Sequence, residues 1–497
     1  MNLVTVNHSF QYELEKLLRV FFPAAKIAVT TEPNGEPDVA LTVLERTAGG
    51  ANVTATLCVF GKTRTETAFV SDTETQFGDT DDSLFERKLA LTLFSLLCDA
   101  TGYTPPWGIL TGVRPAKLMN HLVHGWGEAA GTAYFRNELR VSEEKTALAL
   151  AVARQEAPIM TTGDPRSFSL YVSIPFCPSR CSYCSFVSHS NEHAKKLMPD
   201  YVRLLCGELR ETARIAFQLD LKLESVYIGG GTPTALSAEQ LRTVTDAIGT
   251  HFALTPGVEY TIEAGRPDSV TDEKLDVIRN CGATRISINP QTFNDSVLEA
   301  IGRRHTGAQT ETAMHMARSH GFDNINMDLI VGLPTDTFDS FCATLETTLS
   351  FRPENVTVHT LSRKRAATMV TEKLESGDAE AADAMLDHAK RVLTAAGYVP
   401  YYMYRQSNCL GNLENVGWAR PGFACRYNVY MMEETHTVLA VGAGAVTKLC
   451  APAENQIERI FNFKYPYEYI SRFDELLARK QRIPAFYDEV FATKGGE

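Results

Sequence analysis

The chain has 497 residues, of which 44% are apolar and 22% are charged, and its formal net charge is −12. This acidic balance argues against a sequence-independent nucleic-acid surface, which needs a basic field. No apolar run approaches the ~18 residues of a membrane span, and the first residues lack a signal peptide's charged and apolar regions. Eleven cysteines without a small secreted framework indicate reduced thiols and a cytoplasmic protein.

The length predicts roughly three domains at about 150 residues each. We expect a small α/β domain over residues 1–105, a helical connector over 106–165, an α/β core over 166–365 and a mixed C-terminal domain over 366–497. In the first domain, apolar spacing predicts strands over 1–7, 39–44 and 53–60 and helices over 12–22 and 83–98. It contains no constellation of residues for chemistry.

Strand and helix patterns alternate along the core. The predicted strands are 170–174, 225–228, 260–263, 285–289, 326–331 and 356–359, and the predicted helices between them are 198–217, 238–248, 272–280, 308–320 and 337–349. Repeated βα units imply a parallel sheet, and six of them favour an open, partial (β/α)6 TIM-like barrel over a closed eightfold one. Ligands of such sheets bind at the carboxyl ends of the strands.

The C-terminal region begins with a predicted helix over 379–396, followed by an aromatic and basic run at 401–405. A polar, glycine-rich stretch at 408–422, a strand meeting a glycine turn at 438–447 and a helix over 466–480 complete it. We expect this domain to cover one mouth of the barrel.

Three cysteines follow the first core strand in a CxxxCxxC spacing: Cys177, Cys181 and Cys184. Three thiolates on one loop can bind three irons of a 4Fe–4S cubane and leave the fourth iron open to a small molecule. Zinc is an alternative, for which His189 and His193 are the nearby candidates for a fourth ligand. Buried inert thiols are the other alternative, although unrelated core cysteines rarely take two fixed spacings after a strand.

The second core strand runs into three glycines, in the sequence VYIGGGTPT over residues 226–234. Glycines let a backbone approach a ligand and present its N–H and C=O groups without side chains in the way. Alone, this triplet is weak evidence and is more often a turn. Its position at the strand end next to the cysteine loop strengthens the prediction of a binding site.

Together, the cysteine loop and the glycine triplet resemble the radical S-adenosylmethionine (SAM) superfamily. Within it, the chain is similar to oxygen-independent coproporphyrinogen III oxidases (dehydrogenases). Further matching segments are TIEA at 261–264, RISINPQ at 285–291, NMDLIVGLP at 326–334 and GNLENVG at 411–417. With GILTGVRP at 108–115, they resemble the longer Firmicute-type branch, which has an extra N-terminal region.

This resemblance implies roles for the matched residues. The three cysteines are expected to hold the cluster, whose open iron takes the amine and carboxylate of SAM. The expected SAM contacts are Tyr171, Gly230, Gly231, Thr232, Glu263, Gln291, Arg303 and Asp328. Tyr171 and Arg303 are also expected to act in catalysis. Carboxylates suit an amine or ribose hydroxyls, and an arginine suits a carboxylate.

The resemblance implies a radical SAM oxidoreductase of heme biosynthesis. An external one-electron reductant is expected to reduce the cluster, and SAM cleavage to yield a 5′-deoxyadenosyl radical. That radical is expected to start the oxidative decarboxylation of two coproporphyrinogen III propionates, giving protoporphyrinogen IX. A macrocycle with four propionates needs cations and aromatic surface, and candidates near the C-terminus are Arg363, Lys364, Arg365, Tyr401, Tyr402, Tyr404, Arg405, Arg420 and Arg426.

Two positions depart from the family pattern. Ser173 stands where the decarboxylases often have a histidine, and Phe186 where they carry a fourth cysteine. Relatives without that cysteine include heme-handling proteins, so a heme-binding chaperone of the same fold is the main alternative. A radical SAM enzyme that methylates or opens heme is another. Cys409, Cys425 and Cys450 lack CxxC-type spacing, and we expect buried thiols rather than an auxiliary cluster.

Overall fold

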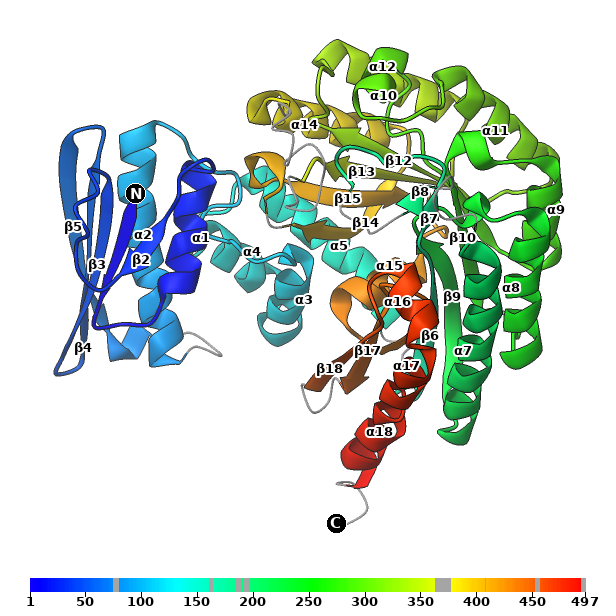
Figure 1. Ribbon diagram of the computed structural model, residues 1–497. Coiled ribbons are helices and arrows are strands. Elements are labelled where there is room, and N and C mark those ends of the chain that lie inside the picture. Colours follow the sequence, from blue (N-terminus) through cyan, green and yellow to red (C-terminus); the bar gives the residue numbers. More distant parts are fainter. Residues whose placement is uncertain are drawn as a thin grey trace. The chain divides into compact units, whose positions relative to one another are not determined.

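The computed structural model describes residues 1–74, 80–160, 164–184, 189–190, 196–362, 377–406, 408–451 and 456–492. Phe186, His193 and the basic run 363–365 lie outside these described residues. The chain forms two compact units, Met1–Ala151 with Gly411–Leu413 and Val152–Leu410 with Glu414–Glu497 (Figure 1). Among the described helices, none has both the length and the apolar character that crossing a membrane requires.

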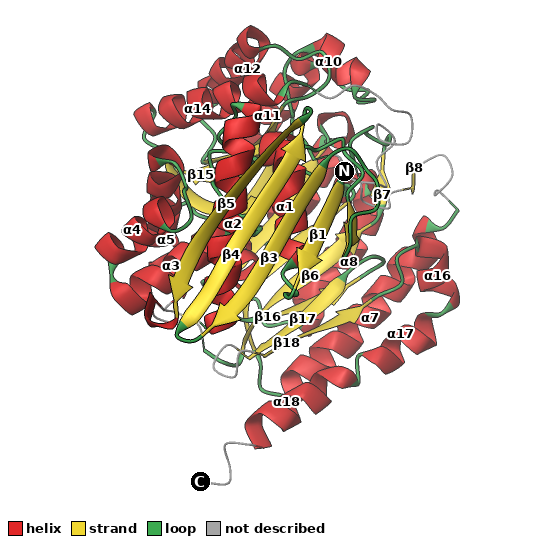
Figure 2. Ribbon diagram, turned by 90° about the vertical axis from the view of Figure 1, so that its left-hand side faces the viewer, coloured by secondary structure: helices red, strands yellow, loops and turns green. Residues whose placement is uncertain are grey.

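The first unit is built on a five-stranded sheet in the order β2-β1-β3-β4-β5 (Figure 2). Its strands are β1 (Asn2–Val6), β2 (Ala28–Thr30), β3 (Val39–Thr47), β4 (Gly50–Val59) and β5 (Lys62–Ser71). Every second residue of β4 is buried, and one apolar core joins this face to helices α1 (Gln11–Phe21) and α2 (Asp81–Thr101). The helices α3 (Pro115–Trp126), α4 (Glu128–Asn137) and α5 (Glu143–Met160) follow along the chain.

The strands and helices predicted for this unit are confirmed, but the pattern missed the three-residue strand β2 and also β5. Eight of its ten positions are exposed, so its sequence carries no apolar alternation. It forms because the turn at Gly61, where φ is +71°, folds it back to pair with β4 along its whole length.

The second unit contains an eleven-stranded sheet in the order β14-β15-β13-β12-β11-β10-β9-β6-β16-β17-β18. Six neighbouring strands of this sheet are parallel: β6 (Ser167–Ile174), β9 (Lys222–Gly230), β10 (Glu259–Gly265), β11 (Arg285–Ile288), β12 (Ile325–Val331) and β13 (Asn355–Thr360). They are the six predicted strands, and the predicted α/β fold of six βα units is confirmed.

The connections between these strands are helical, as predicted. They contain α7 (Met198–Gln218), α8 (Ala238–His251), α9 (Asp272–Asn280), α11 (Gly307–Ser319) and α12 (Phe338–Ser350). Serine or threonine side chains cap the starts of the last four helices by accepting a backbone N–H of the first turn. The sequence pattern missed α10 (Asp295–Ala300), which is too short to show helical periodicity.

The C-terminal segment extends the same sheet instead of forming a separate one. Beside β13 lie β15 (Glu414–Ala419) and then β14 (Val399–Arg405), both antiparallel to their neighbours. At the other edge, β16 (Thr437–Val441) runs parallel to β6, and β17 (Val446–Ala451) and β18 (Gln456–Phe461) continue antiparallel. A substrate-covering role for this segment stays a prediction.

The helices of this segment follow the prediction in part. They are α14 (Ala379–Ala395), α15 (Arg426–Glu433), α16 (Pro466–Ser471), α17 (Phe473–Arg479) and α18 (Arg482–Ala492). The helix predicted over 379–396 is present as α14. The helix predicted over 466–480 is broken into two at Arg472, whose φ of −121° is not helical.

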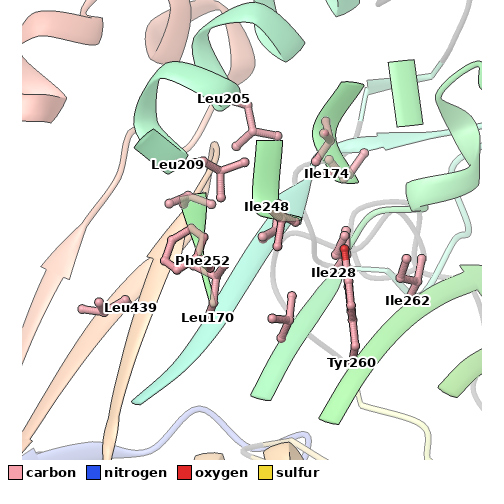
Figure 3. Close-up of a cluster of buried hydrophobic side chains, with 14 of the residues drawn as sticks. Leu170, Ile174, Leu205, Leu209, Ile228, Ile248, Phe252, Tyr260, Ile262 and Leu439 are labelled. Atoms are coloured by element: carbon pink, nitrogen blue, oxygen red, sulfur yellow. The ribbon is translucent and has the colours of Figure 1, made fainter. Parts of the chain in front are cut away.

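The parallel strands have an apolar face and a polar face. Leu170, Ile228 and Ile262 pack with residues of α7 and α8 in the main core, among them Leu205 and Ile248 (Figure 3). Because successive strand residues point to opposite faces, their chain neighbours Tyr171, Tyr227 and Glu263 lie on the other face of the sheet. The same alternation adds Ser287, Asn326, Asp328, Thr357 and His359 to this polar face.

Candidate functional site

The cysteine loop begins where β6 ends. Cys177 closes the two-residue strand β7 (Phe176–Cys177), which pairs with β8 (His189–Ser190). Cys184 donates its backbone N–H to the carbonyl oxygen of Cys181 at 3.1 Å, so the loop turns tightly between these two cysteines. Cys181 is 8% exposed, while Cys177 and Cys184 are half-buried.

The described residues do not supply a ready site for a single metal ion. Among them, no three His, Cys, Asp or Glu side chains lie close enough together to hold one ion. His193 and the side chain of His189, the candidates for a fourth zinc ligand, lie outside the described residues.

The glycine triplet lies directly against the cysteine loop. Gly231 donates its N–H to the carbonyl oxygen of Ile174 at 2.7 Å, and Thr232 donates its own to that of Phe176 at 2.8 Å. The Thr232 hydroxyl is 3.5 Å from the Sγ atom of Cys177. A Cβ atom on Gly231 would lie 2.6 Å from the Phe176 oxygen and 3.0 Å from the Cys177 sulfur. Only glycine therefore fits at position 231 without moving the loop.

Two buried arginines approach Cys181. Arg266 donates from Nη1 to the Cys181 sulfur at 3.5 Å, and Arg303 donates from Nη1 to the Asn289 carbonyl oxygen at 2.6 Å. Burial by itself raises the pKa of the Cys181 thiol, but the positive charges of Arg303 and Arg266 outweigh it and lower this pKa. The thiolate, which is the metal-binding form of cysteine, is thereby favoured.

Two hydrogen bonds join the cysteine loop to the turn that follows α10. Ser182 donates its N–H to the Ile301 carbonyl oxygen at 2.9 Å, and the Ser179 hydroxyl donates to that of Gly302 at 3.1 Å. A cavity of about 380 Å³ lies between the two segments, lined by Pro178, Ser179, Arg180, Glu299, Gly302, Arg303 and Arg304. The turn therefore supports the loop that carries the cysteines.

Glu263 lies on the polar face, next to the glycine triplet. Its Oε1 atom accepts a hydrogen bond of 2.5 Å from the Tyr227 hydroxyl. A Cβ atom on Gly229 would lie 3.0 Å from the carboxyl carbon of Glu263. Burial raises the pKa of Glu263 to about 7. The hydrogen bond from Tyr227 lowers this pKa, whereas the negative charge of Asp328 raises it further.

Asp328 has the opposite electrostatic character. Burial opposes its ionisation, but His359 and a hydrogen bond from Asn326 prevail and lower the pKa of Asp328. The Asn326 Nδ2 atom donates to Asp328 at 2.8 Å, and the His359 Nε2 atom is 3.8 Å from the same carboxylate oxygen. The polar face thus holds one carboxyl group that is readily protonated and one that stays ionised.

Gln291 follows β11 with the unusual φ of +69°. Its N–H donates to the Asp328 carbonyl oxygen at 2.9 Å, and its own carbonyl accepts from Ile330 at 3.0 Å, so it is fixed beside β12. The Oε1 atom of Gln291 and the Nε atom of Arg303 are buried without a hydrogen-bond partner among the described residues. Such groups are costly unless a ligand or water satisfies them.

Tyr171 belongs to an aromatic stack. Its ring centroid is 6.3 Å from that of Tyr227 on the neighbouring strand, and Tyr427 of α15 stacks against both rings at 6.2 and 4.4 Å. Burial raises the pKa of the Tyr171 hydroxyl, with the charge of Glu263 adding to it. This stack borders the polar face with flat apolar surface, which suits a planar ligand.

The arginines and tyrosines suggested for substrate binding do not gather at one place. Tyr404 and Arg405 lie at the end of β14 that pairs with Glu414, and the Tyr404 hydroxyl is 3.3 Å from His359. Arg426 instead bonds to Glu224 and Gly257 near the amino ends of β9 and β10. Arg420 likewise donates its N–H to the carbonyl of Glu354, ahead of β13.

These positions correct the idea of one C-terminal cationic site. The cysteine loop follows the carboxyl end of β6. The amino ends of the parallel strands are therefore at the opposite ends of the strands from this loop. Arg420 and Arg426 therefore lie away from the candidate site, and the basic run 363–365 lies outside the described residues. Arg405 is the one arginine of the described candidates at the carboxyl ends of the strands.

Cys409, Cys425 and Cys450 are all buried, in agreement with the prediction of core thiols. The Cys425 thiol donates to Glu259 at 3.3 Å at the amino end of β10, whereas Cys409 lies 4.0 Å from the Thr360 carbonyl oxygen at the carboxyl end of β13. Cys450 is in β17. The three thiols are thus in different parts of the sheet.

Sequence reasoning missed three residues of this region. Tyr227 sits inside the quoted VYIGGGTPT segment, and its position two residues before the triplet predicts that it shares a face with Gly229. His359 is a polar residue at the end of the predicted strand 356–359, which is a signal of its own. Arg266 carried a weaker signal, a basic residue between a glycine and a proline directly after a predicted strand.

Residues 171–348 match the family model described as the Radical SAM superfamily, which identifies the class of protein. HemZ of Bacillus subtilis, described as an oxygen-independent coproporphyrinogen-III oxidase-like protein, is 37% identical over 401 residues, covering 80% of each chain. The heme chaperone HemW of Haemophilus influenzae is 30% identical over 320 residues, covering 64% of this chain and 78% of its own.

Among solved structures, coproporphyrinogen III oxidase (HemN) of Escherichia coli, titled a radical SAM enzyme, has a TM-score of 0.50 at 23% identity. The match covers 67% of this chain and 72% of that one, and it shows a shared fold. With the similarity to HemZ, it follows that the chain belongs to the family of oxygen-independent coproporphyrinogen-III oxidase-like proteins in the radical SAM superfamily.

Membership of the superfamily implies a 4Fe–4S cluster and SAM, and the described residues fit both. Three thiols on one loop, one of them favoured as the thiolate, suit iron. The unsatisfied polar atoms of Gln291 and Arg303 suit a polar ligand beside that loop.

The carboxyl group of Glu263 yields a pH prediction. Its pKa is about 7 in the folded protein, above the value of 4.5 expected for an exposed glutamate, so the folded state holds this proton more tightly. The resulting stabilisation is complete below pH 4.5 and is lost as the pH rises through 7. Glu263→Gln is expected to stabilise the cofactor-free protein at pH 8 by on the order of 3 kcal/mol, with little effect at pH 4.5.

Urea unfolding of both proteins at several pH values measures this difference. Glu239→Gln, an exposed glutamate on α8, is the control and is expected to change stability by less than about 0.5 kcal/mol at every pH. A Glu263→Gln difference that does not vary with pH would contradict the assignment of this pKa.

Proposed function

We propose that the chain binds a 4Fe–4S cluster through Cys177, Cys181 and Cys184 and uses it with SAM on a porphyrinogen. The proposed reaction converts two propionate groups of coproporphyrinogen III into vinyl groups and so forms protoporphyrinogen IX. The observation that carries the proposal is the setting of the cysteine loop. Cys177 lies against Gly231 of the glycine triplet, and the Cys181 thiol lies near two buried guanidinium groups. Similarity to the oxidase-like HemZ supports the substrate class.

When bound, the reduced cluster and SAM supply a species able to take a hydrogen atom from an unactivated carbon. The protein's own residues position the reactants. The polar atoms of Glu263, Gln291 and Asp328 can hydrogen-bond the amine and hydroxyl groups of SAM. Arg303 supplies a cation for a carboxylate.

The proposed reaction also requires an external electron acceptor and an external reductant. Each propionate loses one hydrogen atom and one molecule of carbon dioxide, and the electron that remains must pass to an external acceptor. An external one-electron reductant must also reduce the cluster. The aromatic stack at Tyr171, on the polar face of the sheet, offers apolar surface of the kind that a macrocycle requires.

An anaerobic assay tests the proposal. Purified protein with a reconstituted cluster is incubated with SAM, a one-electron reductant and coproporphyrinogen III. We expect stepwise release of two molecules of carbon dioxide per porphyrin, with cleavage of SAM in proportion. SAM cleavage without any loss of carbon dioxide would contradict the proposed reaction while leaving the cofactor assignment in place.

A heme-binding chaperone is the second candidate, supported by similarity to HemW and by Ser173. Ser173 is buried at the position where decarboxylases often have histidine, and its hydroxyl donates to the Ala443 carbonyl oxygen at 2.9 Å. A Cβ atom on Gly230 would lie 2.9 Å from this hydroxyl, so a larger side chain at 173 has little room. Tight, stoichiometric heme binding without turnover in the same assay would favour this candidate.

A further inference from the structure

We propose that Arg266 is a positioning residue of the cluster site. It anchors the cysteine loop and stabilises the negative charge of the Cys181 thiolate and the cluster bound to it. This inference rests on the proposed cluster at the three cysteines, and it concerns a residue outside the matched cofactor contacts. Arg266 is 3% exposed, so its charge acts where water screens it little.

The chain aims Arg266 at the loop through an irregular strand end. The pairing of β10 with β11 shifts by one residue between Glu263 and Gly265, which is a β-bulge. Gly265 has a φ of +44°, and the Arg266 N–H folds back to the Ala264 carbonyl oxygen at 2.6 Å. A bulge of this kind turns the next side chain in a new direction, here across the sheet end toward the cysteine loop.

The backbone of Arg266 is held in this position. Its carbonyl oxygen accepts from the N–H of Ser269 at 2.9 Å and from the Ser269 hydroxyl at 2.7 Å. The Ser269 hydroxyl is 2.7 Å from that of Thr234, which in turn donates to the Ala264 carbonyl oxygen at 2.8 Å. Thr234 is the last residue of the glycine-triplet segment. This segment therefore contacts the cysteine loop and also stabilises the β-bulge.

The guanidinium group then directs its donors at three residues, Ser179, Cys181 and Asp268. Nη2 donates to the Ser179 hydroxyl at 2.9 Å, while Nη1 lies 3.4 Å from the Ser179 carbonyl oxygen and 3.5 Å from the Cys181 sulfur. On its other edge, Nε pairs with Asp268 at 3.2 Å. Asp268 thus orients the planar group and leaves one N–H directed at the sulfur.

Hydrogen bonds to the sulfurs and nearby charge are known determinants of the reduction potential of an iron–sulfur cluster. A buried cation with an N–H···S contact stabilises the reduced, more negative form and therefore raises the potential. A purely structural clamp would stabilise the loop and leave the potential unchanged. The potential is therefore the readout that separates the two roles.

The test uses the full-length protein with a reconstituted cluster. Arg266→Met combined with Asp268→Asn removes both members of the ion pair, so that no half-buried carboxylate loses its partner. We expect a more negative midpoint potential in a redox titration followed by electron paramagnetic resonance. Iron loss to a chelator is expected to be roughly 10- to 100-fold faster, by analogy with the loss of metal affinity when a residue that orients a metal ligand is changed.

Arg266→Lys is the conservative variant. It keeps the charge, but an ammonium group cannot contact Asp268, Ser179 and Cys181 together as the planar fork does. We expect a potential close to wild type with accelerated iron loss. Arg304→Gln is the control, since Arg304 is an exposed arginine lining the cavity beside the same loop. It is expected to change neither quantity, because exposed charges are screened.

A wild-type potential and a wild-type rate of iron loss in the folded double variant would overturn the inference. If that variant does not fold, Ser179→Ala removes the anchor without touching a charge, and unchanged iron loss there would overturn it equally. Neither readout involves a porphyrin. Failure of the decarboxylation assay therefore contradicts the proposed reaction alone, whereas a wild-type chain that takes up no cluster contradicts both.

Discussion

Cys181→Ala is expected to abolish the reductive cleavage of SAM and most of the visible absorption of a reconstituted cluster. Cys181 is the most buried of the three loop cysteines, and two guanidinium groups favour its thiolate. Alanine removes the thiolate and leaves the loop with two ligands. The arginines remain paired with Asp268 and with the Asn289 carbonyl, so the fold is expected to persist.

The measurement is the yield of 5′-deoxyadenosine and methionine under anaerobic reduction, together with iron content and circular dichroism. Cys342→Ala, a half-buried cysteine on α12, is the matched control and is expected to retain wild-type cluster content and cleavage. Retained cleavage with an undiminished cluster spectrum in Cys181→Ala would refute the assignment of the site.

Gly231→Ala is expected to have the second largest effect, a loss of roughly 100-fold in the rate of SAM cleavage. The added methyl carbon would meet the carbonyl oxygens of Phe176 at 2.6 Å and Ile174 at 2.8 Å, and the Cys177 sulfur at 3.0 Å. These are backbone atoms and an expected ligand atom, so relief requires the loop itself to move. Overpacking of this kind typically costs about 1–3 kcal/mol in stability.

The control is Gly249→Ala on the exposed side of α8, where an added Cβ meets no atom within 4 Å. There alanine is expected to be neutral or to stabilise the helix by about 1 kcal/mol. Thermal unfolding and single-turnover SAM cleavage of both variants give the comparison. Wild-type cleavage by Gly231→Ala would show that the close packing of Gly231 against the cysteine loop is not needed for the reaction.

Most of the core could be predicted from the sequence because each strand there is a short segment rich in apolar and β-branched residues between helical patterns. The strands β14 and β15 could not. Residues 414–419 lie in a polar, glycine-rich stretch, and residues 399–405 have the character of an aromatic and basic run. They become strands only by pairing with each other and with β13, which is a long-range contact without a local signal.

The same distinction applies to the candidate site. By itself, the sequence predicted the cysteine loop, the glycine triplet and Glu263 at a strand end, because spacing along one loop or strand is a local property. Only the tertiary structure decided that Arg266 turns toward Cys181. It also decided that Arg426 lies at the amino ends of the strands, away from the cysteine loop. A β-bulge and the antiparallel return of the chain set these directions, and both depend on which distant strands pair.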